Sequence, residues 1–236
     1  MARLDIYLVD TGVVDSRTKA QNLIKNALVS VNGKIIKKSS YSLESEDNVV
    51  ISEHKSYVSR SAHKLAYFLE EISLDIQDRV ALDIGSSTGG FTQVLLENGV
   101  KEVSAVDVGK EQLHRSLKED KRVFSYESCD IRKFESEKSF DLVVSDVSFI
   151  SLHYILDDVQ RLATDKIILL FKPQFEVGKD VKRDKNGVVV DKKAIANAMQ
   201  RFEDATTLMG WKLLVKSPSK LTGKEGNLEY CYYFEK

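Results

Sequence analysis

The chain has 236 residues, of which 42% are hydrophobic and 30% are charged, and its 35 basic side chains nearly balance its 36 acidic ones. This composition is that of an ordinary globular protein and excludes a disordered, fibrous or collagen-like chain. The longest uninterrupted apolar stretch, Ile167–Phe171, is far shorter than the roughly 20 residues that a membrane-spanning helix needs.

The first residues and the cysteines indicate where the protein works. Asp5 falls where a secretion signal would have its apolar segment, so we expect no such signal. Two cysteines, Cys129 and Cys231, make no disulfide framework and fit a reducing cytoplasm. The four histidines are scattered without the spacing of metal ligands, so we expect no metal site.

Positive charge is concentrated near the amino terminus. No acidic residue occurs between Asp15 and Glu44, whereas six basic residues do: Arg17, Lys19, Lys25, Lys34, Lys37 and Lys38. Such a cluster is typical of a protein that binds a phosphate backbone. By charge alone, a solvated helix face beside a basic hairpin is an equally good interpretation.

Local patterns in this region predict a small α+β module. Leu4 and the next apolar residues have helical spacing and predict a short helix that ends near Gly12. Ser16 is the expected N-cap of a second helix. Asn32-Gly33 lies between two apolar pairs and predicts a tight β-hairpin.

These residues resemble the S-four RNA-binding domain, named after a ribosomal protein. The resemblance rests on motifs in the order Arg3-Leu4-Asp5, Ser16-Arg17, Leu23-Ile24 and Val29-x-Val31-Asn32-Gly33. It implies that the second helix and the hairpin bind structured RNA, so the six basic residues become predicted RNA ligands. We therefore predict an S-four-like RNA-binding domain over residues 1–52, followed by a polar linker over residues 53–60.

From residue 61 to residue 236, helical and strand patterns alternate, which is typical of a mostly parallel sheet wrapped by helices. Four consecutive strands are expected, at residues 80–84, 103–106, 142–145 and 167–171. The residues at or just after their ends are Asp83 and Gly85, Asp107, Asp146, and Lys172. Because ligands bind at the carboxyl ends of parallel strands, we expect these residues to share one site.

A glycine-rich loop, Gly85-Ser86-Ser87-Thr88-Gly89-Gly90, follows the first of these strands. It lacks the Gly-Lys-Ser/Thr of a triphosphate-binding loop and the second glycine of a dinucleotide fingerprint. Asp107 is placed to accept hydrogen bonds from both hydroxyls of a ribose. The arrangement resembles class I S-adenosylmethionine-dependent methyltransferases, whose cofactor has a ribose and an adenine but no phosphate. A structural turn that binds no ligand is the alternative.

Longer motifs resemble the TlyA family, often labelled hemolysin A. They are Ser59-Arg60-Ser61-Ala62-His63-Lys64-Leu65, the segment Leu82–Thr92, Val106-Asp107-Val108-Gly109-x-x-Gln112-Leu113, Asp146-Val147-Ser148-Phe149-Ile150-Ser151-Leu152, Lys172-Pro173-Gln174-Phe175-Glu176 and Gly226-Asn227-x-Glu229-Tyr230. Members of this family join an S-four domain to an FtsJ-like domain that methylates ribose 2′-hydroxyls of ribosomal RNA. The resemblance implies a Rossmann-like α/β domain over residues 61–236, with a mostly parallel seven-stranded sheet.

The resemblance also implies the site residues. The catalytic residues are then Lys64, Asp146, Lys172 and Glu229. The residues implied to bind S-adenosylmethionine are Asp83, Gly85, Ser86, Ser87, Thr88, Gly89, Gly90, Asp107 and Asp130. A ribose hydroxyl must lose its proton as it attacks, and a partly desolvated lysine beside a second cation is a usable base. We assign that role to Lys172, with Asp146 orienting it, Lys64 positioning the hydroxyl and Glu229 holding the lysines.

The predicted function is methylation of ribosomal RNA, at a cytidine, by an enzyme whose partners are ribosomal RNA or ribosomal subunits. Two other classes of function remain open from the sequence. One is a membrane-lysing hemolysin, although no spanning segment or long basic amphipathic helix is visible and no membrane insertion is expected. The other is an RNA-binding or ribosome assembly factor that keeps the methyltransferase fold without turnover.

Overall fold

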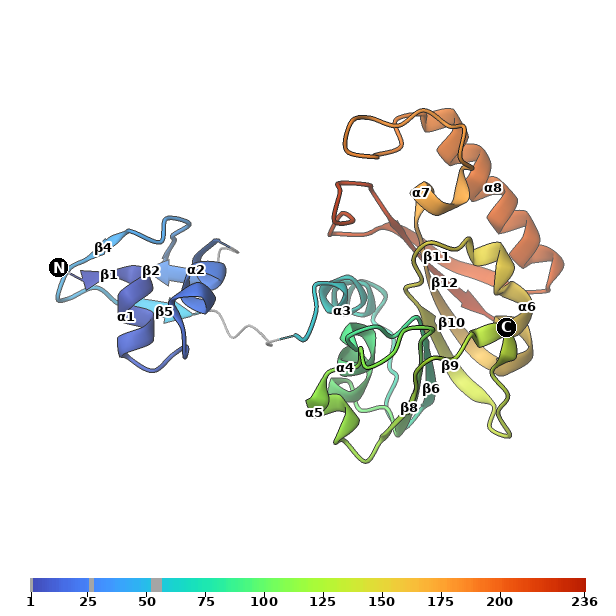
Figure 1. The fold of residues 1–236 in the computed structure, drawn as a ribbon, viewed down its shortest axis with the longest axis horizontal. Coiled ribbons are helices and arrows are strands. Elements are labelled where there is room, and N and C mark those ends of the chain that lie inside the picture. Colours follow the sequence, from blue (N-terminus) through green and yellow to red (C-terminus); the bar gives the residue numbers. More distant parts are fainter. Residues whose placement is uncertain (1, 26–27, 52–56) are drawn as a thin grey trace. The chain divides into compact units, whose positions relative to one another are not determined.

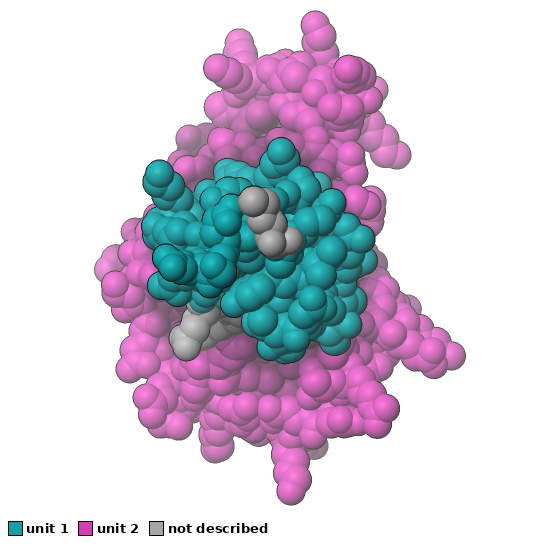
Figure 2. Space-filling view, turned by 90° about the vertical axis from the view of Figure 1, so that its left-hand side faces the viewer, with its two compact units in different colours: residues 1–56 teal, residues 57–236 magenta. Residues whose placement is uncertain are grey.

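The computed structural model describes residues 2–25, 28–51 and 57–236 (Figure 1). The chain divides into two compact units, Met1–Ser56 and Tyr57–Lys236, which are coloured separately in Figure 2. The predicted linker, residues 53–60, lies partly outside the described residues. Its described part belongs to the second unit, where the backbone N–H of Val58 donates a hydrogen bond to Gln93 Oε1 at 2.8 Å.

Over residues 2–25 and 28–51, the first unit contains two helices and five short strands. These are β1 (Ala2–Arg3), α1 (Leu4–Asp10), α2 (Arg17–Lys25), β2 (Val29–Val31), β3 (Lys34–Ile35), β4 (Ser42–Leu43) and β5 (Val49–Ile51). Strand β2 lies between β3 and β5, and β1 pairs with β4. Leu4, Leu8 and Ile24 from the helices share one buried core with Val29 and Val31 of β2.

The N-cap and the hairpin turn predicted for the first unit are confirmed, and the predicted first helix is α1, which ends at Asp10. Ser16 Oγ accepts a hydrogen bond from the backbone N–H of Lys19 at 3.3 Å, as an N-cap should. Asn32 and Gly33 have φ values of 51° and 77°, and the tight hairpin turn requires a positive φ at both positions.

A seven-stranded sheet forms the centre of the second unit, in the order β11-β12-β10-β9-β6-β7-β8. Its strands are β6 (Val80–Ile84), β7 (Glu102–Val106), β8 (Val123–Tyr126), β9 (Phe140–Ser145), β10 (Ala163–Phe171), β11 (Lys212–Pro218) and β12 (Tyr230–Glu235). Strands β6 to β10 are parallel to their neighbours in this series, whereas β12 is antiparallel to both β10 and β11. The predicted mostly parallel seven-stranded sheet is confirmed.

One detail of the strand prediction was wrong. Strands β7 and β9 are not consecutive in the chain, because β8 lies between them. Strand β8 is at the edge of the sheet, where Phe124 is 38% exposed and Tyr126 is 40% exposed. A half-exposed edge strand does not need the continuous apolar run by which the buried strands were recognised.

Helices cover both faces of the sheet (Figure 1). One core joins α3 (Ser61–Ile72), α4 (Gly90–Glu97) and α5 (Arg115–Lys118) to the sheet. The other core joins α6 (Leu156–Leu162) and α8 (Lys192–Leu208) to the opposite face, near the short helix α7 (Pro173–Glu176). Two single 3₁₀ turns, Ile131–Lys133 and Leu152–Tyr154, complete the unit. In the described ranges, no helix is long and apolar enough to cross a membrane.

Candidate active site

Two hollows open at the carboxyl ends of the parallel strands. The Asp107 pocket has a volume of about 540 Å³, and its lining includes Asp107, Gln112, Asp130 and Ile155. The Lys64 pocket has a volume of about 490 Å³, and its lining includes Arg60, Lys64, Ser86, Thr88, Thr222 and Lys224. The two pockets share four wall residues, which are Gly85, Ser87, Asp146 and Ser148. A ligand in one pocket therefore lies next to a ligand in the other.

The glycine loop forms part of this shared wall. Gly85 has a φ of +78°, and a Cβ there would lie 3.0 Å from Val147 Cγ1. Gly89 has a φ of +93°, and a Cβ there would lie 2.3 Å from Leu117 Cδ1. Both glycines have a positive φ, which residues with a side chain rarely adopt, and both lie so close to a neighbouring side chain that a Cβ would clash with it. Three residues that were predicted to bind the cofactor, Asp83, Gly89 and Gly90, line neither of these two pockets.

Asp83 is fully buried at the end of β6. Its Oδ2 accepts a hydrogen bond from Thr92 Oγ1 at 2.6 Å, whereas its Oδ1 has no hydrogen-bond partner among the described residues. Burial raises the pKa of this carboxyl to about 7, and the nearby negative charge of Asp146 acts in the same direction. Because Asp83 is fully buried and lines neither pocket, its predicted contact with the cofactor stays a prediction.

Asp107 closes the other side of the Asp107 pocket, directly after β7. Its Oδ2 accepts a hydrogen bond from the backbone N–H of Ser87 at 2.8 Å, and its Oδ1 accepts one from Gly109 at 2.6 Å. The carboxylate is thereby fixed against the glycine loop. Each of its oxygens keeps a further lone pair that can accept from a ligand hydroxyl.

Asp130 also lines the Asp107 pocket, but its carboxylate is held by Arg132. Arg132 Nη2 donates to Asp130 Oδ2 at 2.6 Å, and this guanidinium lowers the pKa of Asp130 to about 2. The side chain also caps the 3₁₀ turn by accepting from the backbone N–H of Arg132. A contact with a ligand would therefore be made by a carboxylate that already has a charged partner.

Lys172 and Asp146 form an ion pair at the junction of the two pockets. Lys172 Nζ lies 2.6 Å from Asp146 Oδ1, and it donates a hydrogen bond to Ser148 Oγ at 2.8 Å. Lys172 is 6% exposed and lines neither pocket, whereas Asp146 and Ser148 line both. The Lys172 amine therefore contacts Asp146 and Ser148 from the protein side of the wall that the two pockets share.

Lys64 and Glu229 form a second ion pair. Lys64 Nζ donates to Glu229 Oε2 at 2.5 Å, and Gln174 Nε2 donates to Glu229 Oε1 at 3.3 Å. Gly223 faces the same carboxylate, because a Cβ there would lie 2.6 Å from Glu229 Oε1. Gln174 is only two residues beyond Lys172, so it connects the two ion pairs. All four predicted catalytic side chains are thus brought together.

Sequence reasoning missed the roles of Ser148 and Gln174. Both occur within motifs that carried the family resemblance, Asp146-Val147-Ser148 and Lys172-Pro173-Gln174. Their roles could not be predicted because neutral side chains are common near strand ends, whereas the neighbouring charges of Asp146 and Lys172 are not. Arg60 and Lys224, two further cations on the Lys64 pocket, were missed because neither directly follows a strand.

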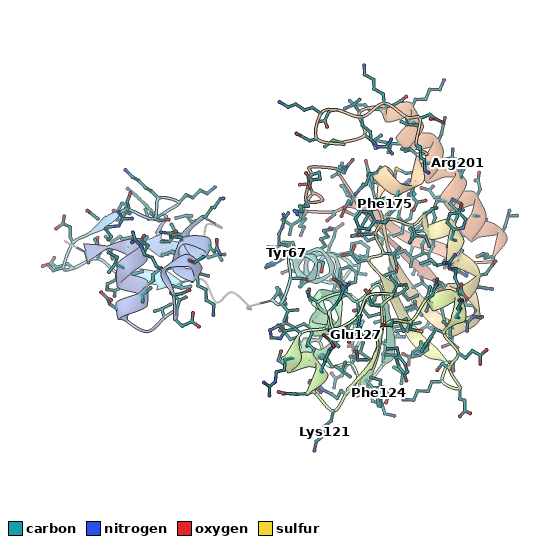
Figure 3. All side chains as sticks on the ribbon, in the orientation of Figure 1. Tyr67, Lys121, Phe124, Glu127, Phe175 and Arg201 are labelled. Carbon is teal, nitrogen blue, oxygen red and sulfur yellow. The ribbon has the colours of Figure 1, made fainter. Side chains whose placement is uncertain are left out.

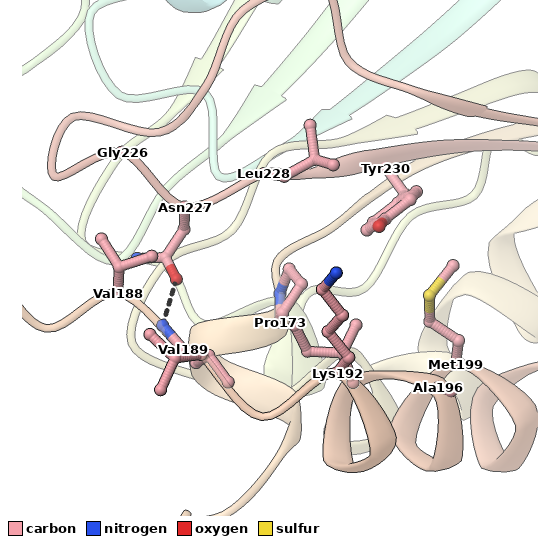
Figure 4. Close-up of a pocket in the computed structure, with 12 residues that line it drawn as sticks. Pro173, Val188, Val189, Lys192, Ala196, Met199, Gly226, Asn227, Leu228 and Tyr230 are labelled. Carbon is pink, nitrogen blue, oxygen red and sulfur yellow. Dashed lines mark hydrogen bonds between the residues drawn. The ribbon is translucent and has the colours of Figure 1, made fainter. Parts of the chain in front are cut away.

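A third hollow, of about 580 Å³, lies between the start of α8 and the segment before β12 (Figure 4). Its lining is mainly apolar, and Asn227 Oδ1 accepts a hydrogen bond there from the backbone N–H of Val189 at 3.0 Å. Leu228 and Tyr230 border it on either side of Glu229 in the sequence. None of the residues drawn in Figure 4 was predicted as a site residue.

In the first unit, all six predicted RNA ligands are exposed. Arg17 Nε nevertheless donates to the buried Asp5 Oδ2 at 2.9 Å, and Lys19 Nζ lies 2.8 Å from Asp15 Oδ2. Hydrogen bonds from Arg3, with further donors Gln21 and Arg17, hold the pKa of Asp5 well below its usual range. Arg17 is therefore partly committed to the interior of its own unit.

Comparisons with known proteins agree with this two-unit organisation. Residues 57–236 match the FtsJ-like methyltransferase family, and residues 2–49 match the S4 domain family. The 23S rRNA (cytidine-2′-O)-methyltransferase TlyA of Campylobacter jejuni is 47% identical to this chain, over 94% of each. Hemolysin A of Brachyspira hyodysenteriae is 35% identical, over 98% of this chain and 99% of that protein. A solved structure from Streptococcus thermophilus is 32% identical to this chain. The superposition covers 100% of this chain and 88% of the other one, with a TM-score of 0.73.

Proposed function

This chain belongs to the TlyA family, which joins an S4 domain to an FtsJ-like S-adenosylmethionine-dependent methyltransferase domain, and from that premise we propose its substrate and site. The proposed reaction is methyl transfer to the ribose 2′-hydroxyl of a cytidine in ribosomal RNA. The Campylobacter relative is named for that activity. The observation that carries the proposal is the wall shared by two pockets, with Lys172 directly behind it.

The residues of the Asp107 pocket fit the nucleoside part of S-adenosylmethionine. Asp107 keeps acceptor capacity for ribose hydroxyls, and Gly85 has no side chain that would stand between its backbone and a ligand. Asp107 and the glycine loop would hold the cofactor, and Asp130 would lie at the adenine end. When bound, S-adenosylmethionine supplies an already activated methyl group.

The protein's own contribution to the chemistry is then positioning and proton removal. We assign the base to Lys172 Nζ, which in its neutral amine form would take the proton of the 2′-hydroxyl as the oxygen bonds to the methyl group, while the methyl–sulfur bond breaks and leaves a thioether. Asp146 and Ser148 fix this amine from two sides. Lys64, held by Glu229, would position the hydroxyl from the opposite side of the Lys64 pocket.

The RNA is proposed to contact both units. Residues 1–52 would anchor structured RNA, residues 53–60 would link the units, and residues 61–236 would carry the chemistry. Arg60 and Lys224 on the Lys64 pocket would face the phosphates beside the target nucleotide. We propose that the enzyme works beside ribosomes in the cytoplasm, because its proposed substrate is ribosomal RNA.

The direct test is methyl transfer from tritiated S-adenosylmethionine to ribosomal subunits purified from a strain that lacks this gene. Nuclease digestion and mass spectrometry should then identify 2′-O-methylcytidine. Subunits from the parent strain, already methylated, are the matched control and should accept little label. Label found only on a base would refute the ribose assignment, and no label with intact cofactor binding would favour an assembly factor. Lysis of liposomes by the pure protein would instead support the hemolysin alternative.

A further inference from the structure

The carboxylate of Glu127 binds the loop and the short helix that follow β7 at three points. Glu127 Oε1 accepts hydrogen bonds from the backbone N–H of Gln112 at 2.5 Å and of Leu113 at 2.8 Å. Its Oε2 pairs with Lys118 Nζ at 2.7 Å. Glu127 itself directly follows β8 (Figure 3). These contacts fix the loop from outside the pocket and lower the pKa of Glu127 to about 2.

The same loop brings the Gln112 amide close to Asp107. A Cβ on Gly109 would lie 1.9 Å from Gln112 Nε2 and 3.0 Å from Asp107 Oδ1, so both groups border the space above Gly109. Gly109 is itself fixed, because its N–H donates to Asp107 at 2.6 Å and its carbonyl accepts from Ser128 at 2.7 Å. Any side chain at residue 109 would displace the amide of Gln112.

Gln112 and Asp107 both line the Asp107 pocket, and their chemistry is complementary. Asp107 can only accept hydrogen bonds, and each of its oxygens already has one N–H donor. The Gln112 side-chain amide has two N–H donors, and no hydrogen bond of that amide is found within the described residues. A ribose hydroxyl can donate to a carboxylate and accept from an amide at the same time.

We propose that Gln112 is a cofactor-binding residue, which donates from its side-chain amide to a ribose hydroxyl that Asp107 also contacts. Glu127 is a positioning residue, since it holds the backbone of Gln112 and touches no ligand. Gly109 is required at its position because its bare backbone leaves room for the amide. The proposal depends only on cofactor binding, which can be measured without RNA. It therefore stands or falls independently of the ribosomal substrate.

The first test measures binding of S-adenosylhomocysteine by calorimetry. Gln112→Leu keeps most of the volume but removes the amide, and it should weaken binding about tenfold, the effect of one lost hydrogen bond. Analogues that lack the 2′- or the 3′-hydroxyl identify the contact. The intact protein should discriminate against one of them, and Gln112→Leu should lose that discrimination. Gln200→Leu, on α8, is the matched control and should bind all three ligands like the intact protein.

Two results would overturn the assignment of Gln112. One is unchanged affinity of Gln112→Leu for all three ligands. The other is an equal loss for all three ligands, which would mean that Gln112 only fills space above Gly109. Gly109→Ala should reproduce the loss of discrimination, because its Cβ displaces the same amide.

The second test separates the role of Glu127 from plain stability. Glu127→Ala removes the acceptor of the Gln112 and Leu113 N–H groups, and it should raise KM for the cofactor several-fold while kcat at saturating cofactor is kept. It should also reduce discrimination between the deoxy analogues. Glu127→Gln retains a carbonyl acceptor and should restore much of the affinity. A Glu127→Ala protein that is less heat-stable but discriminates normally would refute the positioning role.

Discussion

Lys64 Nζ and Glu229 Oε2 lie 2.5 Å apart, although 165 residues separate them in the chain. Their side chains are 10% and 3% exposed, so the pair is almost removed from water. Lys64 lies on α3 at the beginning of the second unit, and Glu229 precedes β12 near its end. The pair therefore fastens the two ends of this unit to each other beside the Lys64 pocket.

Breaking this pair should be costly. Glu229→Gln would leave the Lys64 ammonium buried without its carboxylate, and we expect a loss of about 3 kcal/mol in the free energy of unfolding. Chemical denaturation of the full chain measures it. The control is Glu119→Gln, because its partner Arg115 is 88% exposed and the loss there should be below about 1 kcal/mol. Similar losses of unfolding free energy in the two variants would show that the buried pair stabilises the fold no more than the exposed pair does.

Replacement of Lys172 and of Asp107 should give opposite phenotypes. Lys172→Met should lower the rate of methyl transfer by about 10²–10⁴-fold, the usual contribution of a general base, with S-adenosylhomocysteine affinity near that of the intact protein. Asp107→Ala should mainly weaken cofactor binding. Single-turnover kinetics and calorimetry on both variants provide the two readouts. Full activity of Lys172→Met would remove Lys172 from the proposed catalytic set.

Asp83 should make folding less favourable as the pH rises through the weakly acidic range. Its pKa is 3.8 in the absence of burial and about 7 in the folded protein, so between these values the folded state keeps a proton that the unfolded state has lost. The free energy of unfolding should therefore fall by up to about 1.4 kcal/mol per pH unit in that window. Asp83→Asn cannot titrate and should lack this contribution. Denaturation of both proteins at pH 4.5, 5.5 and 6.5 measures the difference, and parallel pH profiles would contradict the prediction.

The strand ends could be predicted from sequence because two simple signals coincide there. Val80–Leu82 and Ile167–Phe171 are apolar runs of the kind that a buried parallel strand requires, and each is followed directly by a charged residue, Asp83 or Lys172. Parallel pairing then places those carboxyl ends side by side without further information. This reasoning correctly predicted that Asp107, Asp146 and Lys172 would lie at the same end of the parallel strands.

The partners of these residues could not be predicted in the same way. Glu127 binds backbone N–H groups, and every residue except proline offers one, so no residue type in the loop identifies the contact. Lys64 and Glu229 meet only because β12 is inserted antiparallel between β10 and β11. Arg17 belongs to the acid-free stretch from which the basic cluster was inferred, but its partner Asp5 comes before that stretch, so the stretch itself gave no sign of the pairing.

That pairing sharpens the prediction for RNA binding. Arg17→Ala would withdraw a donor from the buried Asp5, so weaker RNA binding by that variant could reflect unfolding of the first unit. Lys37 and Lys38 are exposed, and the structure pairs neither with an acid within the described residues. Their replacement should change charge alone, which makes them the better test of this surface.

Lys37→Ala/Lys38→Ala should therefore weaken binding of ribosomal RNA and flatten its salt dependence by up to about two units of slope, since each phosphate contact contributes about 0.9. Lys101→Ala/Lys121→Ala is the matched control, because both lysines are exposed and lie just before β7 and β8, at the amino-terminal ends of these strands, whereas the pockets lie at the carboxyl ends. Figure 3 shows Lys121 at this end of the sheet. RNA affinity at several salt concentrations, with cofactor affinity measured in parallel, distinguishes lost phosphate contacts from a damaged fold. Equal slopes for the two double variants would show that the hairpin region of the S4 domain does not anchor the RNA.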